Sequence, residues 1–514
     1  MAIANLTRHA WQRVECLFDA VFPLADNPLR QLGALALFLF WIVAGTGIYL
    51  YIVLDTGIDG VHRSIDIMSR QQWYWGGLIR SLHRYASDGF VVIMMLHLLR
   101  EWIMGHFHGH RLYTWLTGIP LLWLAYASGL VGGWLVWDQR GQYSAVATAE
   151  LLDVLPIFAD PMARNFITPQ MMNDRFFSLL VFMHIGLPLL LLLAIWAHVH
   201  RISNVVHLPR RHLALGLSGA LILLALLFPV VSGAPANLAQ EPVQIGLDWF
   251  FLLLHPATEL SSAWAVWATL FGLTLLFGLF PALPFRRPAP AVVVPKECSG
   301  CGLCYADCPY GAIQMVPISG KRRDLLAQVD ADLCASCGIC VGACPSSTPF
   351  RRTPELVSGI ELPRLSIAHL RGQVDAALAR LHAPQSLIVF GCEHSADAQR
   401  LADADTAIVS LPCIGMLPPA LIEYALRRRS TGVVVCGCRS CEFRLGTRWT
   451  AERLAQQREP HLRIAQETAQ LRILWLEPPQ QQQLATAVAD FRQHLAATAG
   501  SRPSPTPSRN EAMQ

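Results

Sequence analysis

Eight of the fourteen cysteines follow one spacing that occurs twice along the chain. In each run, three cysteines are separated by two residues, and a fourth follows after three more residues, directly before a proline. A cubane iron–sulfur cluster needs four thiolates around one small volume, and in a doubled run the fourth cysteine of each half serves the other cluster. The spacing therefore predicts two 4Fe-4S clusters. Their ligand sets are Cys298, Cys301, Cys304 and Cys344 for one cluster, and Cys334, Cys337, Cys340 and Cys308 for the other.

Structural zinc is the other common use of closely spaced cysteines. Zinc sites of that kind are typically built from two pairs of ligands, with a longer gap between the pairs. Neither cysteine run has that arrangement, so the motif favours iron–sulfur clusters over zinc.

Four histidines in apolar stretches form a second candidate site. His83 and His97 are fourteen residues apart, and so are His184 and His198. Fourteen residues are close to four helical turns, so both members of a pair project from one helix face, ~21 Å apart along the axis. Histidine inside a membrane is costly and is usually functional. We expect two b haems, one held by His83 and His184 and the other by His97 and His198.

Glycines repeat the same interval in two further apolar stretches. A flat macrocycle can approach a helix backbone closely only where there is no Cβ, so these glycines predict contact with the haems. Simple small-residue helix packing is the alternative. Arg80 and Arg100 lie one turn outside the histidines, where they can pair with haem propionates or merely extend to the membrane surface. The four glycines are Gly33, Gly47, Gly118 and Gly132.

The histidines and glycines lie in the apolar first half of the chain, which contributes most of the 53% hydrophobic residues. Six runs there are long enough to cross ~30 Å of hydrocarbon. Arginines flank one end of these runs and acidic residues fill the connections at the other end. By the positive-inside rule, the N-terminus and everything after the sixth run are cytoplasmic, and the chain is an inner-membrane protein. The runs are Leu32–Leu54, Gly77–Met104, Leu112–Val136, Phe176–His200, Leu213–Val231 and Ser262–Leu283.

Composition restricts the surroundings of the second half. Thirteen of the fourteen cysteines lie between Cys298 and Cys441 at ligand-like spacings, whereas a disulfide framework spreads its cysteines through the fold. A reducing, cytoplasmic compartment follows. The net charge of +4 is small, and the chain has no basic run mixed with aromatic residues, so no nucleic-acid partner is expected. Residues 1–30 are amphipathic and predict a segment on the membrane surface rather than a signal peptide.

Short strand-like runs alternate with helical stretches after residue 384. They begin near Ser386, Ala407, Thr431 and Arg472, and the alternation predicts a parallel, doubly wound sheet. The carboxyl ends of such strands meet at one edge, so the cysteines that follow the strands are expected to converge there, which favours a metal cluster. Catalytic dithiol chemistry of Cys438 and Cys441 is the alternative. The cysteines are Cys392, Cys413, Cys436, Cys438 and Cys441.

The first half resembles cytochrome b of the quinol-oxidising cytochrome bc complexes. The resemblance rests on the four histidines, the four glycines and the two arginines, and on Arg175-Phe176-Phe177 and Trp137-Asp138-Gln139. It implies a quinone substrate and a homodimer. Leu247-Asp248-Trp249-Phe250 is similar to the family's Pro-Glu-Trp-Tyr element, which implies Asp248 as the quinone-proton site. The proline is absent here, and aspartate replaces glutamate.

Residues 384–480 resemble the small iron–sulfur (delta) subunit of methyl-viologen-reducing hydrogenases. The resemblance implies one 2Fe-2S cluster and a cytoplasmic flavoprotein partner. The second cysteine of the family's first loop is absent, and Glu393-His394 stand there instead. Nothing in the chain resembles a nickel site. The ligands that the resemblance implies are Cys392, Cys413, Cys438 and Cys441.

Together these features predict a multidomain chain with an all-α bundle of six transmembrane helices, a ferredoxin-like α+β module and a doubly wound α/β domain. The expected parts are an amphipathic segment 1–30, a cytochrome b-like domain 31–285, a proline-rich linker 286–296, a double-cluster module 297–350, a delta-subunit-like domain 365–498 and a disordered tail 499–514.

The expected function is that of a membrane-bound oxidoreductase subunit. It links the quinone pool, through two b haems and the clusters, to a cytoplasmic flavoprotein of heterodisulfide-reductase or NAD(P)H-dehydrogenase type. The alternative is a redox-sensing or docking membrane protein without net turnover. His106, His108 and His110 alternate in a cytoplasmic loop, where a solvated loop is favoured over a metal site.

Overall fold

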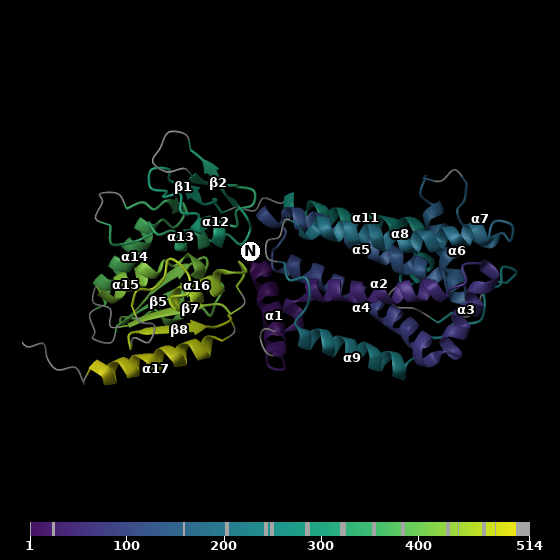
Figure 1. Cartoon of the computed structure of the whole chain (residues 1–514), viewed down its shortest axis with the longest axis horizontal. Coiled ribbons are helices and arrows are strands. Elements are labelled where there is room, and N and C mark those ends of the chain that lie inside the picture. The colour runs from purple at the N-terminus through teal and green to yellow at the C-terminus, as the bar shows by residue number, and fades with distance from the viewer. Residues whose placement is uncertain are drawn as a thin grey trace, which may run out of the picture. The chain divides into compact units, whose positions relative to one another are not determined.

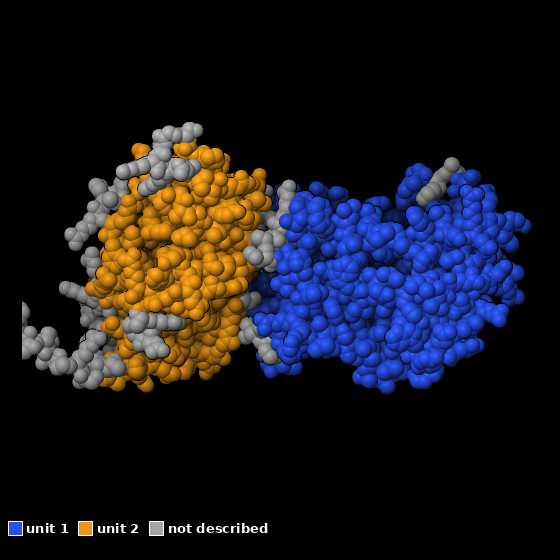
Figure 2. All heavy atoms as spheres, viewed as in Figure 1, with its two compact units in different colours: residues 1–284 blue, residues 285–514 orange. Residues whose placement is uncertain are grey.

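The computed structural model divides the chain into two compact units, Met1–Pro284 and Phe285–Gln514, which Figure 1 traces and Figure 2 colours. The residues that the structure describes are 2–22, 26–157, 160–200, 205–240, 245–246, 251–282, 288–318, 325–351, 356–381, 386–427, 432–439, 441–464, 469–478 and 480–499. Asp248 and residues 500–514 lie outside these ranges.

Unit 1 is helical, and a helix occupies each of the six predicted apolar runs. Within the described residues, four helices are long and apolar enough to cross a membrane. They are α2 (Leu32–Val53), α5 (Leu112–Trp134), α8 (Asp174–Val199) and α11 (Ala263–Leu279), the last extended by one 3₁₀ turn. Helix α9 (Arg211–Leu227) is apolar but shorter, and α4 (Leu78–Ile103) has charged side chains and histidines among its apolar residues.

The long helices of unit 1 pack as two principal pairs, α2 with α4 and α5 with α8 (Figure 1). A buried cluster that includes Leu39, Phe90, Leu121 and Leu191 joins the two pairs. Many outward-facing leucines, phenylalanines and tryptophans of these helices are exposed, such as Trp196, which is 62% exposed. A water-soluble bundle rarely leaves so large an apolar surface uncovered, and lipid accounts for it.

Shorter helices fill the connections of unit 1. They are α3 (Ile58–Arg70), α6 (Gln139–Asp153), α7 (Arg164–Ile167) and α10 (Leu254–Leu260). Asp138 directly precedes helix α6, and its carboxylate accepts hydrogen bonds from the backbone N–H groups of Gly141 and Gly233, both at 2.9 Å. This buried carboxylate caps the helix and ties two connections together. The amphipathic α1 (Ala2–Asp19) occupies most of the predicted surface segment.

Unit 2 begins with two small antiparallel sheets. Strands β2 (Ile313–Pro317) and β3 (Leu325–Val329) pair with each other, and β1 (Val292–Val293) pairs with β4 (Ile360–Glu361). Two short helices, α12 (Leu303–Asp307) and α13 (Ile339–Gly342), lie in the cysteine runs. The stretch 286–296 was expected from its composition to be a spacer. Its second part instead contributes β1, because Val292 and Val293 find a strand partner within unit 2.

The rest of unit 2 contains a four-stranded parallel sheet in the order β6-β5-β7-β8. The strands are β5 (Leu387–Cys392), β6 (Thr406–Leu411), β7 (Gly432–Gly437) and β8 (Leu471–Trp475), at the positions where the sequence predicts strands. Alternate residues of β5 enter two separate core clusters, as the strand period of two requires. Helix α17 (Gln481–Ala499) covers the cluster with Leu387, while α14 (Ile367–Arg380) and α15 (Pro419–Arg427) cover the one with Phe390.

Leu387 and Leu325 offer a matched test of this core. Leu387 is fully buried on β5, whereas Leu325 is 41% exposed on β3. We predict that Leu387→Ala lowers the free energy of unfolding of unit 2 by about 2–5 kcal/mol, because it leaves a cavity between β5 and α17. Leu325→Ala should change it by no more than about 0.5 kcal/mol. Pulse proteolysis of the full chain in increasing urea, followed on unit 2 fragments, measures both, and equal effects would contradict this account of the core.

Candidate functional site

His83 of α4 and His184 of α8 face each other across the bundle. Their ring centroids are 6.3 Å apart, with an interplanar angle of 73°. Two imidazoles that bind one metal ion through Nε2, each at about 2 Å, have centroids roughly 6 Å apart, so the spacing fits two imidazoles that would hold one metal ion between them. Nδ1 of His83 lies 3.1 Å from the Val43 carbonyl oxygen, and Nδ1 of His184 lies 3.0 Å from that of Ser128. A proton on Nδ1 satisfies these carbonyls and leaves Nε2 free for a metal.

The second pair, His97 and His198, lies farther along the same two helices. His97 and His198 lie close enough for their charges to interact. Nδ1 of His198 lies 3.2 Å from the hydroxyl of Thr117. Nδ1 of His97 lies 4.0 Å from a carboxylate oxygen of Glu101. Each level of the bundle therefore holds one histidine from α4 and one from α8.

Each of the four predicted glycines lies against one of these histidine rings. A Cβ atom built on Gly132 would lie 2.6 Å from Cε1 of His184. The corresponding contacts are 3.1 Å for Gly47 with His83, 3.0 Å for Gly118 with His198 and 3.5 Å for Gly33 with His97. The glycines therefore let an imidazole of one helix rest on the backbone of its neighbour. The fourteen-residue interval of the glycines matches that of the histidines because each contact is made at the same two levels.

The two predicted arginines have protein partners in the structure. Arg80 is buried and donates a hydrogen bond to the hydroxyl of Ser69. Arg100 donates to Glu15 of α1 at 2.9 Å and to Glu101 at 3.0 Å. Glu15 is only 4% exposed. Sequence reasoning missed this buried carboxylate, because an acidic residue in an amphipathic segment is usually on the surface.

The alternating histidines are only partly described. Nδ1 of His106 lies 2.6 Å from Glu101, and Nδ1 of His108 lies 3.1 Å from the Gly105 carbonyl oxygen. The side chain of His110 lies outside the described part of the chain. Within that part, no group of three or more His, Cys, Asp or Glu side chains is arranged to hold a single metal ion.

The predicted proton site, Asp248, lies outside the described residues, but polar groups of α6 and α10 are described. Tyr143 of α6 donates a 2.8 Å hydrogen bond to Glu259 of α10. Burial, followed by this hydrogen bond, raises the pKa of Tyr143 to about 12. His255 is buried nearby, with Nε2 at 3.0 Å from the hydroxyl of Thr148. No local motif marks these residues, because they come from separate connections.

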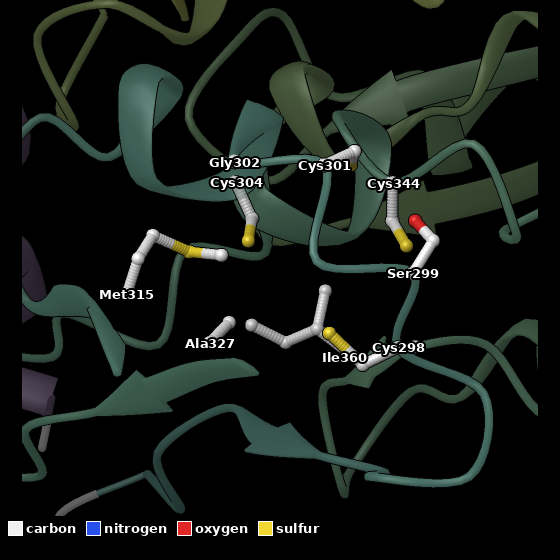
Figure 3. Close-up of a pocket in the computed structure, with 10 residues that line it drawn as sticks. Cys298, Ser299, Cys301, Gly302, Cys304, Met315, Ala327, Cys344 and Ile360 are labelled. Carbon is white, nitrogen blue, oxygen red and sulfur yellow. The ribbon is translucent and has the colours of Figure 1, made fainter. Parts of the chain in front are cut away.

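In unit 2, the first predicted cysteine set lines one pocket (Figure 3). Figure 3 shows the sulfur atoms of Cys298, Cys304 and Cys344 directed into the pocket. Burial, with the neighbouring thiols of the same set, raises the pKa of Cys304 to about 12. Cysteine binds a metal as the thiolate, so a cation in this pocket would offset the cost that burial places on the charged form. Cys301 is the exposed member of the set.

The backbone repeats itself in the two cysteine loops. The residue after the second cysteine, Gly302 or Gly338, has a φ of 78° in both loops. The residue before that cysteine also has a positive φ, 69° at Gly300 and 52° at Ser336. Serine rarely adopts this conformation, and its hydroxyl bonds to the Pro288 carbonyl oxygen at 3.2 Å. Both loops thus turn in the same way and gather three thiols on one side.

The second predicted cysteine set also comes together. Cys340 lies close enough to Cys337, Cys334 and Cys308 for the charges of their sulfur atoms to interact. Burial raises the pKa of Cys337 and of Cys340. Backbone N–H groups approach two of the sulfurs, that of Ala312 at 3.3 Å from Cys308 and that of Ala291 at 3.5 Å from Cys334. Such N–H groups stabilise thiolates of an iron–sulfur cluster.

The third cysteine set lies just past the carboxyl ends of the strands. Sγ of Cys413 is 3.8 Å from Sγ of Cys441, and the thiol of Cys438 hydrogen-bonds to Cys392. Hydrogen bonds from Cys413 and Cys438 lower the pKa of Cys441 to about 3. The four thiols therefore lie within hydrogen-bonding reach of one another, although they come from separate strands. Cys436 stands apart in the α17 core cluster, with its sulfur 3.7 Å from the Ser395 hydroxyl.

The fold and these sites define a class of protein: a helical membrane unit with stacked histidine pairs, joined to an α/β unit with three gathered cysteine sets. The comparisons with known families agree. Residues 22–206 match the model for cytochrome b/b6/petB, residues 297–348 that for the 4Fe-4S dicluster domain, and residues 388–498 that for the methyl-viologen-reducing hydrogenase delta subunit. All three resemblances seen in the sequence are thereby confirmed.

Among the solved structures that match is a hyperthermophilic respiratory Complex III, with 20% identity and a TM-score of 0.40. The match covers 50% of this chain and 75% of that one. The family matches alone make this chain a membrane-bound electron-transfer subunit, because a cytochrome b region implies haem b and a dicluster domain implies 4Fe-4S clusters.

Two adjacent glycines of α5 test the role of the histidine contact. Gly132→Ala places a Cβ within 2.6 Å of the His184 ring, whereas a Cβ on Gly133 meets nothing within 4 Å. We predict that Gly132→Ala displaces the ring and lowers haem affinity at the His83–His184 level by roughly 10–100-fold, as loss of ligand support does at other metal sites. Gly133→Ala should retain all haem. Pyridine haemochrome titration per chain measures both, and full retention in Gly132→Ala would show that the contact is dispensable.

Proposed function

We propose that the chain links the quinone pool, through two b haems and three iron–sulfur clusters, to a cytoplasmic flavoprotein. The flavoprotein is of heterodisulfide-reductase or NAD(P)H-dehydrogenase type. The observation that carries this proposal is the 6.3 Å separation of the His83 and His184 rings, with each Nδ1 near a backbone carbonyl. That arrangement presents two Nε2 atoms to one metal ion inside an apolar bundle.

The residues fit the cofactors as follows. Bound haem and iron–sulfur groups each take up and release single electrons. His83 with His184, and His97 with His198, would hold the two haems, and the four glycines would leave room for the histidine rings. Arg80 and Arg100 serve the haem propionates, with Ser69 and Glu15 orienting the two guanidinium groups. The cysteine sets hold two 4Fe-4S clusters and, on Cys392, Cys413, Cys438 and Cys441, one 2Fe-2S cluster.

We further propose six membrane spans, formed by α2, α4, α5, α8, α9 and α11, with the N-terminus and all cysteine sets in the cytoplasm. The arginine-rich ends of these helices support this orientation. The cytochrome b-like domain corresponds to residues 31–285, the double-cluster module to 297–350 and the delta-subunit-like domain to 365–498. The cytochrome bc resemblance supports a homodimer.

The membrane potential favours one direction of electron flow. When an electron moves outward from an electrically negative cytoplasm, its free energy falls by about 2.3 kcal/mol per 100 mV. Ferredoxin-type clusters also have lower potentials than quinones. We infer that electrons enter through the Cys392–Cys441 domain and reduce quinone, with Asp248 as the proton-exchanging group on the outer side. The Tyr143–Glu259 pair supplies further polar groups in the helix connections of unit 1.

A turnover assay separates this function from that of a redox sensor. In sealed inverted vesicles that contain the full chain, with reduced methyl viologen as donor and a short-chain benzoquinone as acceptor, we predict many quinones reduced per chain. An uncoupler should change the rate, because electrons cross the field. His97→Ala should abolish turnover while leaving the iron–sulfur content intact. Haem reduction that stops after one turnover would assign the chain to the sensor class.

Two cysteines distinguish a cluster from spare thiols in the third set. Cys413 lies in the thiol group, whereas Cys436 lies in the α17 core cluster. We predict that Cys413→Ser in the full chain, purified without oxygen, loses the 2Fe-2S signal, because no other thiol comes from that strand. Cys436→Ser should retain it. Electron paramagnetic resonance (EPR) of the reduced protein gives the answer, and equal loss in both variants would mean that the ligand set is wrong.

A further inference from the structure

A buried carboxylate stands between the second and third cysteine sets of unit 2. Asp307 ends α12, directly before Cys308, and is 1% exposed. Its carboxylate forms ion pairs with two guanidinium groups, that of Arg453 on α16 (Gly446–Leu454) and that of Arg458 at 2.6 Å. The indole N–H of Trp449 donates a 3.2 Å hydrogen bond to the Asp307 carbonyl oxygen. Asp307, a residue of the double-cluster module, is thus held by three side chains of the delta-subunit-like domain.

Arg453 connects this carboxylate to the third cysteine set. Its side chain is 1% exposed, and Nη1 donates a 3.0 Å hydrogen bond to the Gly415 carbonyl oxygen. The backbone N–H of Gly415 in turn approaches Sγ of Cys413 at 3.4 Å. One guanidinium therefore links the residue before Cys308 to the loop that presents Cys413.

The packing at this joint brings the same two sets together. Cys337, Ile339, Cys413 and Trp449 share one buried cluster. A Cβ on Gly338 would lie 2.6 Å from the Met416 sulfur, and one on Gly415 would lie 2.8 Å from Ile339. These loops touch so closely that neither has room for a side chain. Cys301, in the other 4Fe-4S set, is exposed instead.

We propose that Asp307 and Arg453 form a positioning pair. The pair holds the second cysteine set, which contains Cys334, against the third set, which contains Cys413, so that electrons pass directly between these two sets. The first set, which contains Cys298, then lies at the far end of the electron path within unit 2. The pair also sets the reduction potentials of the two clusters. Arg453 stabilises the negative charge of an electron added at the Cys413 set, whereas Asp307 disfavours an electron added beside Cys308. This inference rests on the proposed function, since it requires that the three sets hold clusters.

A purely structural ion pair makes different predictions from a positioning pair. It would affect unfolding but not the potentials of clusters that remain bound. Helix α16 supplies a matched control, because Arg448 forms an ion pair with Glu452 at 2.8 Å while its side chain is 68% exposed. The variants are therefore Arg453→Met, which removes the charge and keeps the stem, Arg453→Lys, which keeps the charge, Asp307→Asn and Arg448→Met.

The first experiment is a redox titration of the full chain, followed by EPR. Arg453→Met should lower the potential of the 2Fe-2S signal so that its reduction equilibrium falls about tenfold, which is about 59 mV for one electron. Arg453→Lys should retain most of the wild-type potential. Asp307→Asn should raise a 4Fe-4S potential instead, and Arg448→Met should change neither. Unchanged potentials in Arg453→Met and Asp307→Asn, with clusters bound, would overturn the proposal. If Arg453→Met does not fold, Asp307→Asn decides it, because only a positioning pair predicts a raised 4Fe-4S potential in that variant.

The second experiment tests the order of the sets. Spin coupling that broadens the reduced 2Fe-2S signal should persist in Cys301→Ala and disappear in Cys337→Ala. The reverse pattern would overturn the assigned order. A wild-type chain that binds no clusters would refute the proposed function itself, which distinguishes that failure from a failure of the positioning pair.

Discussion

The membrane unit depends on contacts between imidazole rings and bare helix backbone. Each of the four histidine rings rests on a glycine of the adjacent helix, and the Cβ positions there lie 2.6–3.5 Å from ring atoms. A ring can approach that closely only where no side chain intervenes. The register between α2 and α4, and between α5 and α8, is therefore set at two levels at once. One constraint accounts for the helix pairing and for the orientation of the histidines.

In unit 2 the corresponding constraint is backbone conformation at the cysteine loops and the strand ends. The positive φ angles at Gly302 and Gly338 turn both loops alike, and the parallel sheet brings Cys392, Cys413 and Cys438 to one edge. Because β5 has β6 on one side and β7 on the other, the thiols gather where the strand order reverses. These cysteines thus converge because the strands run parallel, and not because they are close in the sequence.

Sequence reasoning located the elements whose patterns are long or periodic. The six apolar helices, the four parallel strands and the approach of the cysteine sets were predictable, because hydrophobic runs and ligand spacings are local signals. It missed β1 and β4, which are only two residues each, and the helices in polar connections, such as α6. It also missed the buried charges. Asp307 and Arg453 are 146 residues apart, and no local pattern distinguishes them from surface residues.

The pairing of β1 with β4 has a consequence for biogenesis. Val292 and Glu361 are strand partners, and all eight cysteines of the doubled motif lie between them in the chain. The Ala291 amide also contacts the Cys334 sulfur. This clasp can close only after the ribosome has released Glu361, when both cysteine runs have already emerged. Both cysteine runs therefore belong to an open chain until β1 pairs with β4, and only then are the two ends of this segment tied together.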